Sequence, residues 1–210
     1  MSENASGADN QQGSCSVVNR INPSETTRRA PAFQKIIMAY FLGALHDGTF
    51  SSNERFRISQ KGDDWLKVLR NFLKEIGFSA WIYQEGKTRD IYVLETLAKF
   101  LDFQFNPEDL KTQEEKTAYI RGFFDAEGGI YPPQKSHSKP YLYLHSKHQD
   151  NLNQVANVLS EFQIESRIWR THINEYCLSI GKKASRIAFS QIVGFGLPRK
   201  QSNLEKYGGL

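Results

Sequence analysis

The sequence lacks most features that mark extracellular, membrane or zinc-binding proteins. It has only two cysteines, Cys15 and Cys177, which lie far apart and match no CxxC or Cys/His ligand spacing. A disulfide framework and a zinc site are therefore not indicated. No apolar run approaches the ~18 residues of a membrane helix, and the N-terminus lacks the apolar core of a signal peptide. We therefore expect an intracellular, cytoplasmic protein without a membrane partner.

A strong charge of one sign is also missing. The net charge is +4 and the isoelectric point is near 9.0, which allows a polyanionic partner without requiring one. The 210 residues suffice for one ordinary domain or two small units that share a core. Residues 1–25 are rich in Ser, Asn, Gln and Gly and can bury little apolar area. We therefore assign residues 1–30 to a disordered N-terminal tail.

Beyond this tail, the first part of the chain alternates helices with hairpins. Pro31 suits the first turn of a helix, which the apolar periodicity extends to about Asp47. The further elements that we expect, in chain order, are strands at 48–52 and 55–60 around a turn at 53–54, a helix at 63–77 with Asp63 as N-cap and Gly77 as C-cap, strands at 80–84 and 89–94, and a short helix at 95–101.

The same order of elements then repeats. Thr112 and Glu115 have the spacing of a capping box for a helix that ends near Glu127. The stretch 141–152 corresponds to 56–66, and 166–180 to the second hairpin of the first part. Such a repeat indicates an internal duplication. We therefore expect an α+β fold of two αββαββα units related by pseudo-two-fold symmetry, with the first unit at 31–105, a linker at 106–111 and the second unit at 112–210.

Each unit begins with a helix that contains a glycine and ends in an acid followed by glycine. Gly43 and Gly122 would let the two helices approach closely, so Asp47 and Glu127 would lie near each other. Two carboxylates at helix C-termini repel each other and oppose the dipole. Divalent cations, with carboxylates, backbone carbonyls and water as ligands, would neutralise the pair. Each acid could instead simply start a surface turn, but its recurrence within a repeat favours the paired site.

These motifs resemble those of the LAGLIDADG homing endonucleases, in the single-chain form with two motifs. The stretch "IRGFFDAEG" (120–128) is close to the family motif along its whole length, and "FLGALHDG" (41–48) is a looser copy. The resemblance covers about residues 33–207 and extends notably to archaeal intron-encoded members. It implies a monomer with pseudo-dimeric halves that binds a long, loosely palindromic double-stranded DNA site through a saddle of β-strands and cuts both strands.

One departure from the family pattern leaves two alignments of the halves open. Five positions separate the helix glycine from the acid in the second half, and four in the first. Alignment on the acid-Gly pairs puts His46 where the second half has Ala126, and it predicts an asymmetric helix interface. Alignment on the glycines would leave the first half without an acid at the active position, which would indicate a nicking or inactive enzyme.

The resemblance assigns the metal-bound centre to the ends of the two motifs. Asp47 and Glu127, with the preceding residues His46 and Ala126, would hold Mg²⁺ or Mn²⁺. The stretch "SQKGDDW" resembles a family segment in which a glutamine, here Gln60, helps to order solvent around the metals.

Three lysines are further catalytic candidates. Lys61 follows Gln60, and Lys147 follows Ser146 at the corresponding place in the second half, so both would lie near scissile phosphates. Each could equally be a solvated lysine at a strand end. The stretch "PRKQSNL" resembles a family segment with a catalytic lysine, which favours Lys200 over its neighbour Arg199.

Binding to DNA is expected from the strand faces and hairpin tips. A β-ribbon that carries hydrogen-bond donors can read base edges in the major groove, while basic residues at the rim contact phosphate. Each arginine could also be a phosphate contact or a solvated surface charge. The predicted DNA-binding residues are Arg55, Arg57, Ser59, Lys87, Arg89, Tyr141, Tyr143, His145, Arg167, Arg170 and His172.

Together these features predict a homing endonuclease that makes metal-dependent, staggered cuts in both strands of DNA. Two alternatives remain. An RNA maturase that assists splicing of a host intron could keep the fold and the basic face without needing the acids. A catalytically idle DNA-binding protein of the same fold would be expected to have lost one or both of them.

Overall fold

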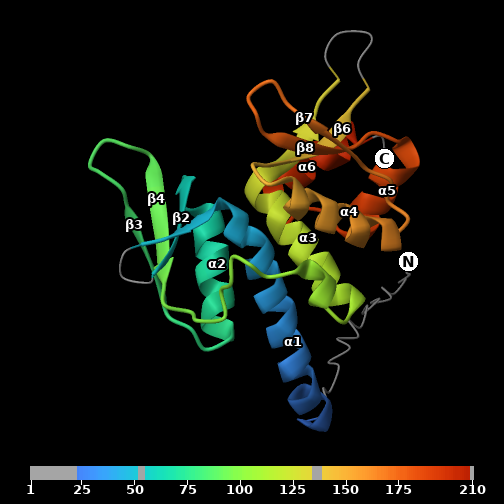
Figure 1. Cartoon of the computed structure of the whole chain (residues 1–210). Helices are drawn as coiled ribbons and strands as arrows, with labels where there is room; N and C mark the ends of the chain where they lie inside the picture. The colour runs from blue at the N-terminus through green and yellow to red at the C-terminus, as the bar shows by residue number, and fades with distance from the viewer. Residues whose placement is uncertain (1–22, 52–54, 134–138, 209–210) are drawn as a thin grey trace, which may run out of the picture.

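Two helices run side by side through the middle of the molecule, with one α+β unit on each side (Figure 1). The first is α1 (Pro23–Ala44), continued by the 3-10 turn η1 (Leu45–Asp47), and the second is α3 (Gln113–Glu127). The computed structural model describes residues 23–51, 55–133 and 139–208.

The other elements complete the two units in the same order. In the first unit these are β1 (Gly48–Phe50), β2 (Phe56–Lys61), α2 (Asp64–Glu75), β3 (Ala80–Gln84) and β4 (Ile91–Thr96). In the second unit, after the short turn η2 (Pro107–Asp109), they are β5 (Gly128–Tyr131), β6 (Tyr141–Ser146), α4 (Gln149–Glu161), β7 (Arg167–Arg170), β8 (Tyr176–Ile180), α5 (Lys183–Ile192) and α6 (Pro198–Tyr207).

The two sheets have the same topology and the same register. Their antiparallel strand orders are β1-β2-β4-β3 and β5-β6-β8-β7. Gly48 of β1 pairs with Ile58 of β2, and Gly128 of β5 pairs with Leu144 of β6. In both units the glycine that follows the motif acid therefore occupies the same place in the sheet. The predicted α+β fold and its internal duplication are confirmed.

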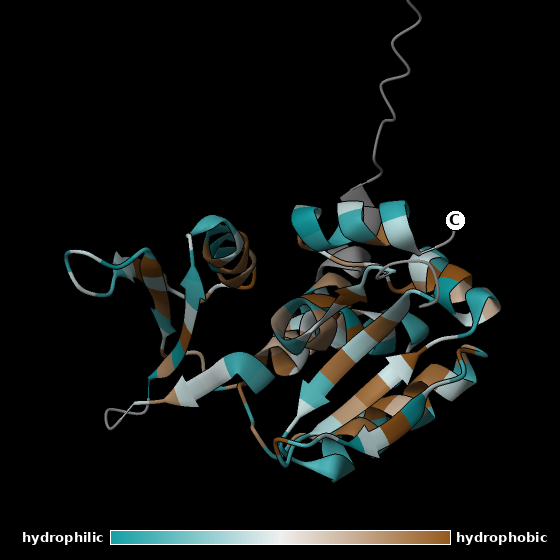
Figure 2. Cartoon of the chain, turned by 90° about the horizontal axis from the view of Figure 1, so that it is seen from above, coloured by the Kyte–Doolittle hydropathy of each residue, from teal (hydrophilic) through white to brown (hydrophobic). Residues whose placement is uncertain are grey.

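Each sheet has one apolar face, which is covered by helices. In β2, Phe56 and Ile58 are buried while Arg57 is partly exposed and Ser59 is exposed, and the same alternation recurs in β6. Figure 2 shows it as alternating hydrophilic and hydrophobic bands along the strands. The period of two places the more exposed residues of each strand on the opposite face, called here the outer face.

The predicted caps are largely confirmed. Thr112 accepts a hydrogen bond from the Glu115 amide, and the Glu115 carboxylate accepts from the Thr112 amide, which is the expected capping box. Gly77 has a φ of +85° just beyond α2, where the left-handed conformation favours glycine. Asp63 takes the N-cap position of α2, although its carboxylate contacts Lys67 rather than a backbone amide.

The prediction that the first helix starts at Pro31 was wrong. α1 begins at Pro23, so Pro31 lies inside the helix, and residues 23–30 of the predicted tail are helical. Pro23 is itself suited to a first turn, and a proline removes one backbone donor without preventing helical geometry on both sides. The predicted tail up to residue 22 and the predicted turn at 53–54 lie outside the described residues.

The predicted helix at 95–101 was also wrong. Strand β4 continues through Thr96, because Glu95 pairs with Arg57 and Thr96 pairs with Phe56 of β2. The Thr96 hydroxyl donates to the Ser79 carbonyl and accepts from the Ala98 amide, which stabilises an irregular turn instead. Among the described residues, the closing helix of the αββαββα unit is therefore found only in the second unit, where it is divided into α5 and α6.

Among the described residues, none of the helices combines the length and the apolar character needed to cross a bilayer.

Candidate active site and nucleic-acid interface

The two central helices cross at their glycines. A Cβ at Gly43 would overlap the Tyr119 carbonyl, and a Cβ at Gly122 would overlap the Tyr40 carbonyl. Both carbonyls belong to the residue three positions before the glycine of the other helix, so the crossing is symmetric. The backbone crossing is symmetric because this contact does not depend on side chains. The predicted asymmetry of the interface lies instead in the polar side chains that bond across it.

The glycine crossing and the acid-Gly pairs are both in equivalent positions, although the spacing between them differs. The first helix tightens into the 3-10 turn Leu45–Asp47, whereas α3 stays α-helical to Glu127. One α-helical step and three 3-10 steps from Gly43 advance about 7.5 Å. The α-helical steps from Gly122 to Glu127 advance the same about 7.5 Å. The steeper rise of the 3-10 turn compensates for the missing residue. The alignment on the glycines and the alignment on the acid-Gly pairs are therefore compatible in space.

A tyrosine beside each glycine bonds across the helix pair. The Tyr40 hydroxyl donates to Asp125 Oδ2 at 2.7 Å, and the Tyr119 hydroxyl lies 3.0 Å from His46 Nε2. Each tyrosine lies three positions before the glycine of its own helix. Its bonding partner lies three positions after the glycine of the opposite helix. Within the helix pair, His46 therefore corresponds to Asp125. Sequence analysis missed this pairing because it compared His46 with Ala126.

His46 is held on both of its ring nitrogens. Its ring stacks on Phe123 with 3.5 Å between centroids, and Nδ1 lies 3.5 Å from the Asn151 amide nitrogen. Burial lowers the pKa of His46 to about 4, and nearby His148 adds to the shift, so the imidazole is neutral at pH 7. The side chain of His46 therefore supports the interface between the units.

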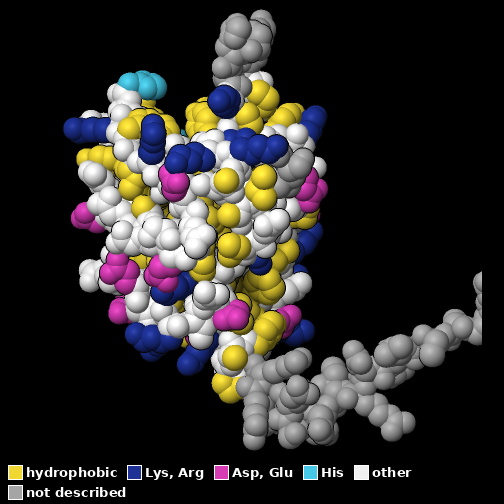
Figure 3. All heavy atoms as spheres, turned by 90° about the vertical axis from the view of Figure 1, so that its right-hand side faces the viewer, with side chains coloured by type: hydrophobic (Ala, Val, Ile, Leu, Met, Phe, Trp, Pro, Cys, Tyr) yellow, Lys and Arg dark blue, Asp and Glu magenta, His cyan; other side chains and the backbone are white. Residues whose placement is uncertain are grey.

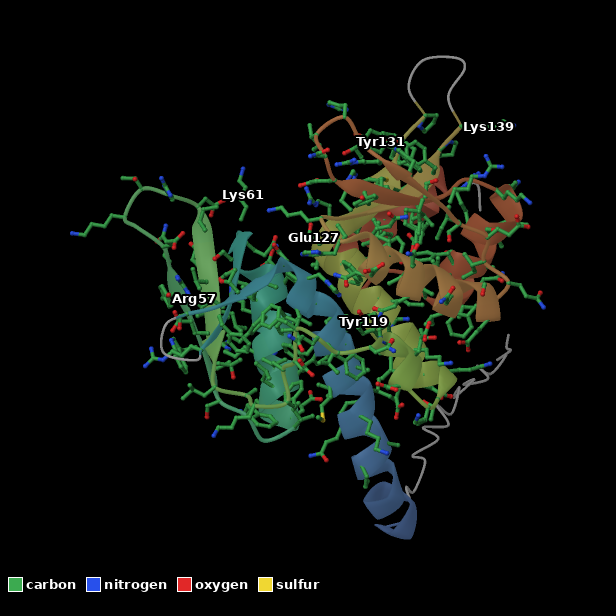
Figure 4. The ribbon with its side chains drawn as sticks, in the orientation of Figure 1. Arg57, Lys61, Tyr119, Glu127, Tyr131 and Lys139 are labelled. Atoms are coloured by element: carbon green, nitrogen blue, oxygen red, sulfur yellow. The ribbon has the colours of Figure 1, made fainter. Side chains whose placement is uncertain are left out.

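Asp47 and Glu127 line one cleft of about 480 Å³ between the two units. Figure 4 shows Glu127 in this central position, with Lys61 at the end of β2 in the first unit. Burial raises the pKa of Asp47 to about 7, and the charge of Glu127 adds to the shift. Burial also raises the pKa of Glu127. Ionisation of both partly buried carboxyl groups is unfavourable without a counter-charge, so together they form a site suited to a cation.

The donor set suits a hard cation with water in its shell. Within the described ranges, no group of three or more His, Cys, Asp or Glu side chains is placed to hold a metal. Two carboxylates are typical of Mg²⁺ sites, in which water and other oxygen atoms complete the shell. The residues present therefore fit Mg²⁺ or Mn²⁺ better than zinc.

The strand ends place polar side chains around the cleft. The Gln60 amide donates to Asp47 Oδ2, so this glutamine orients the carboxylate directly. Gln60 pairs with Tyr92 and Ser146 pairs with Tyr176, which makes Gln60 and Ser146 equivalent. Lys147, which follows Ser146, lines the cleft.

Lys200 of α6 reaches the end of α3 from the other side. Its ammonium donates to the carbonyls of Phe124 at 3.0 Å and Asp125 at 2.6 Å. Burial lowers the pKa of Lys200 to about 8, and the carboxylates of Asp125, Asp47 and Glu127 partly offset this shift. Lys200 therefore places a positive charge beside both motif acids while it caps the carboxyl end of α3.

Asp125 is a site residue that sequence analysis missed. It is 1% exposed, and it accepts hydrogen bonds from Tyr40 and from the amides of Gly196 and Leu197. The Trp65 indole in turn donates to Tyr40 at 3.0 Å. This network ties α1 and α2 to the loop before α6, and so fixes the helix that carries Lys200. An acid inside an apolar motif, two residues before Glu127, was the available signal.

The outer faces carry most of the predicted DNA-binding residues. Tyr141, Tyr143 and His145 share one face of β6, where Tyr131 stacks on Tyr141 with 5.2 Å between centroids. Arg170 lies over the Tyr176 ring at 6.0 Å. The hairpin tips hold Lys87, Arg89 and His172, and the start of β7 holds Arg167.

The fold and this cleft define a duplicated α+β protein whose paired carboxylates lie at the ends of two crossing helices. Residues 114–194 match the family model of the LAGLIDADG-like domain. An uncharacterised protein of Methanocaldococcus jannaschii is 29% identical over 194 residues, covering 84% of this chain and 71% of that protein. The chain therefore has the LAGLIDADG fold, and the family model covers most of its second unit.

Solved structures share this fold. A structure from a study of mesophilic variants of the homing endonuclease I-DmoI superimposes with a TM-score of 0.61 and 22% identity, covering 82% of this chain and 98% of that chain. The N-terminal LAGLIDADG domain of DUF199/WhiA superimposes with a TM-score of 0.62 and 16% identity, covering 83% and 87%. I-DmoI has been solved in complex with DNA and Mn, and a variant of I-DmoI with its target DNA in the presence of Mg.

Proposed function

We propose that this protein is a site-specific endonuclease that uses Mg²⁺ or Mn²⁺ to cut both strands of a long, loosely palindromic DNA site. The observation that carries the proposal is the pair formed by Asp47 and Glu127. They end equivalent helices, line one cleft and have raised pKa values that a divalent cation would reverse. The same fold in the homing endonuclease I-DmoI supports the proposal.

The side chains around the cleft have separate roles in this proposal. Asp47 and Glu127 hold the cations, with oxygen atoms of the preceding residues His46 and Ala126 as further candidate ligands. A bound divalent cation would supply charge that activates water and stabilises the leaving 3′ oxygen. Gln60 keeps the Asp47 carboxylate in place through its hydrogen bond.

The lysines act on the negative charge of the phosphates. Lys61 and Lys147 follow equivalent strand positions, one in each unit, so each would serve one scissile phosphate. Lys200 is bound at the end of α3, to the carbonyls of Phe124 and Asp125. It would therefore balance the charge of the carboxylate pair.

The outer faces of the two sheets would bind the DNA, with one unit on each half of the site. Figure 3 shows Lys and Arg side chains gathered along the upper part of the second unit. Since the single chain supplies both units, a monomer would suffice. The proposed contacts, to bases or to phosphates, are Arg55, Arg57, Ser59, Lys87, Arg89, Tyr141, Tyr143, His145, Arg167, Arg170 and His172.

The proposal is tested by incubating the protein with a library of long duplexes in Mg²⁺ and mapping the ends. We expect staggered cuts at one site. The duplex should remain uncut in four controls: with EDTA, with Ca²⁺ in place of Mg²⁺, with Asp47→Asn and with Glu127→Gln. End mapping also identifies the target duplex. Absence of any site-specific cut in Mg²⁺ or Mn²⁺, by protein that is folded, would contradict the endonuclease proposal.

One feature favours a second candidate, an RNA maturase. Tyr131 and Trp169 are 43% and 42% exposed on the second unit, and exposed aromatic rings can stack on unpaired RNA bases. A competition separates the candidates: labelled target duplex is challenged with intron RNA and with random duplex at two salt concentrations. If intron RNA displaces the duplex at both concentrations and no cleavage occurs in Mg²⁺, the maturase is favoured.

A further inference from the structure

A buried carboxylate lies on the outer face of the first sheet, where DNA-binding residues are expected. Glu95 of β4 is only 7% exposed. Its side chain accepts a hydrogen bond from the Tyr83 hydroxyl at 2.7 Å and lies 3.0 Å from Arg57 Nε and 3.4 Å from Arg55 Nη1. These four residues, Arg55, Arg57, Tyr83 and Glu95, are called the Glu95 clamp below.

Strand pairing fixes the geometry of the Glu95 clamp. Arg57 of β2 is directly opposite Glu95 of β4, and Trp81 of β3 is opposite Glu95 on the other side. Arg57 also donates to the Tyr83 hydroxyl at 3.0 Å, while the guanidinium of Arg55 lies over the Trp81 ring at 5.2 Å. Both arginines are therefore held in place before any ligand binds.

The Glu95 clamp sets one carboxylate against two arginines, so only one of their two positive charges is balanced within it. The Tyr83 hydroxyl, and then the two arginines, hold the pKa of Glu95 below its usual range despite its burial, so the carboxylate is ionised at pH 7. A second carboxylate, that of Glu85, lies 3.5 Å from Arg57. The nearby negative charges weaken the attraction of both arginines for phosphate, while their fixed planes still present N–H groups at the outer face.

At the equivalent strand positions of the second sheet, which the structure describes, this arrangement has no counterpart. The register that joins Arg57 to Glu95 joins Tyr143 to Ser179 in the second sheet. The position of the carboxylate is thus taken by a neutral serine, and that of the arginine by a tyrosine. The clamp is a property of the first unit alone and does not follow from the duplicated framework.

We propose that Glu95 is a specificity-determining residue, which restrains Arg55 and Arg57 so that the first unit binds its own base sequence rather than phosphate in general. The inference rests on the proposed DNA-binding function. A carboxylate among arginines costs affinity for every duplex alike, because phosphate is present in all of them. Prepositioned guanidinium groups keep their value for base edges, which only the correct sequence offers.

The test compares Glu95→Gln with the unaltered protein on random-sequence duplex and on the duplex identified by end mapping. Freed arginines should bind random duplex about 3- to 10-fold more tightly, and the slope of log K against log salt should steepen by about 0.9 for each phosphate gained. The ratio of target to random affinity should fall. Restoring the charge balance with the double variant Glu95→Gln/Arg57→Gln should return the slope to its original value.

Two further variants keep the result decisive. Glu75→Gln removes the same charge at the end of α2, away from the outer face, and should leave the slope unchanged. Tyr83→Phe loosens the clamp without changing charge and should act in the direction of Glu95→Gln, which covers a Glu95 variant that does not fold. Unchanged slopes in folded Glu95→Gln and Tyr83→Phe, or an equal change in Glu75→Gln, would overturn the inference. If the unaltered protein shows no preference for any duplex, the proposed function fails instead.

Discussion

The first unit presents charged residues restrained by a carboxylate on its outer face, whereas the second presents stacked tyrosines at the equivalent positions. Beneath these faces, the strand order and register of the two units are the same. The difference teaches which positions the duplicated fold constrains. Residues that touch the other helix or the core are held by packing, whereas outer-face residues contact only their neighbours and whatever binds there.

The ends of the central helices likewise combine positions that are equivalent in the two units with positions that differ. The glycines and the acids occupy equivalent places, although one helix ends in a 3-10 turn and the other does not. Between them, the first unit has His46 bound to Tyr119, and the second has Asp125 bound to Tyr40. One pair contains the carboxyl group of Asp125, whose pKa is raised by burial, and the other contains the neutral imidazole of His46. Four predictions test where the two units are equivalent and where they differ.

The largest effect is expected where the units are most alike. Asp47→Asn and Glu127→Gln should each lower the rate of double-strand cleavage by roughly a thousand-fold or more, because each removes a ligand charge from the shared cleft. Specific binding in Ca²⁺ should remain. Cleavage assays on the mapped duplex, together with binding measurements, provide the check. Normal cutting by Asp47→Asn would show that the first acid is not part of the active centre.

The glycine crossing should be equally sensitive on both sides. Gly43→Ala and Gly122→Ala each place a Cβ against a backbone carbonyl, which cannot move as a side chain can. Each should lower the free energy of unfolding by about 3 kcal/mol or more. Thermal and denaturant unfolding measure this loss. Gly181→Ala, which has open space around it, is the control. A mild effect at one of the two helix glycines would show that the crossing is less symmetric than its backbone contacts.

The carboxylate pair should make the metal-free protein sensitive to pH. The folded-state pKa of Asp47, about 7, lies above its ordinary 3.8, so ionisation of this group costs the folded state free energy. The penalty is absent below pH 3.8 and complete above about pH 7. Asp47→Asn should therefore stabilise the metal-free protein at pH 8 by on the order of 2 kcal/mol, allowing for partial exposure. Denaturant unfolding in EDTA at pH 5 and pH 8 gives the comparison, and a gain that is the same at both values would contradict it.

The smallest effect separates the two tyrosines. Tyr40→Phe removes a donor from buried Asp125 and an acceptor from the Trp65 indole, whereas Tyr119→Phe removes one contact of neutral His46. The expected losses of unfolding free energy are about 2 kcal/mol and about 1 kcal/mol. Unfolding curves of the two variants test the order. Equal losses would contradict the expected order, in which Tyr40 contributes more because it bonds to both Asp125 and Trp65.

Much of the framework could be predicted because it depends on local pattern. The alternation of β2 and β6, the capping box of Thr112 and the repeat of helices and hairpins each depend on residues close together in the sequence. The helix expected at 95–101 failed for the opposite reason. Glu95 is part of a strand because it pairs with Arg57, which lies far earlier in the chain. The residues near 95–101 alone do not indicate that pairing.

The candidate site was predictable only in part. The motif acids and Gln60 stand beside recognisable glycine or strand signals, and the structure brings them together. Asp125 and Tyr40 are 85 positions apart, and their bond depends on how two helices cross. The partnership of Glu95 with Arg55 likewise follows from strand pairing across the sheet. The roles of all these residues in binding and cleavage stay predictions.

The 3-10 turn at Leu45–Asp47 bears on how proteins of this fold can be recognised. In both helices the rise along the axis from the crossing glycine to the motif acid is the same. A helix can reach this rise with five α-helical residues, or with four when the last turn is 3-10. A search for a fixed number of letters between glycine and acid would find the second motif here and pass over the first. Single-residue deletions in such motifs are therefore compatible with an intact catalytic geometry, and comparing rise along the helix would find motifs that letter spacing misses.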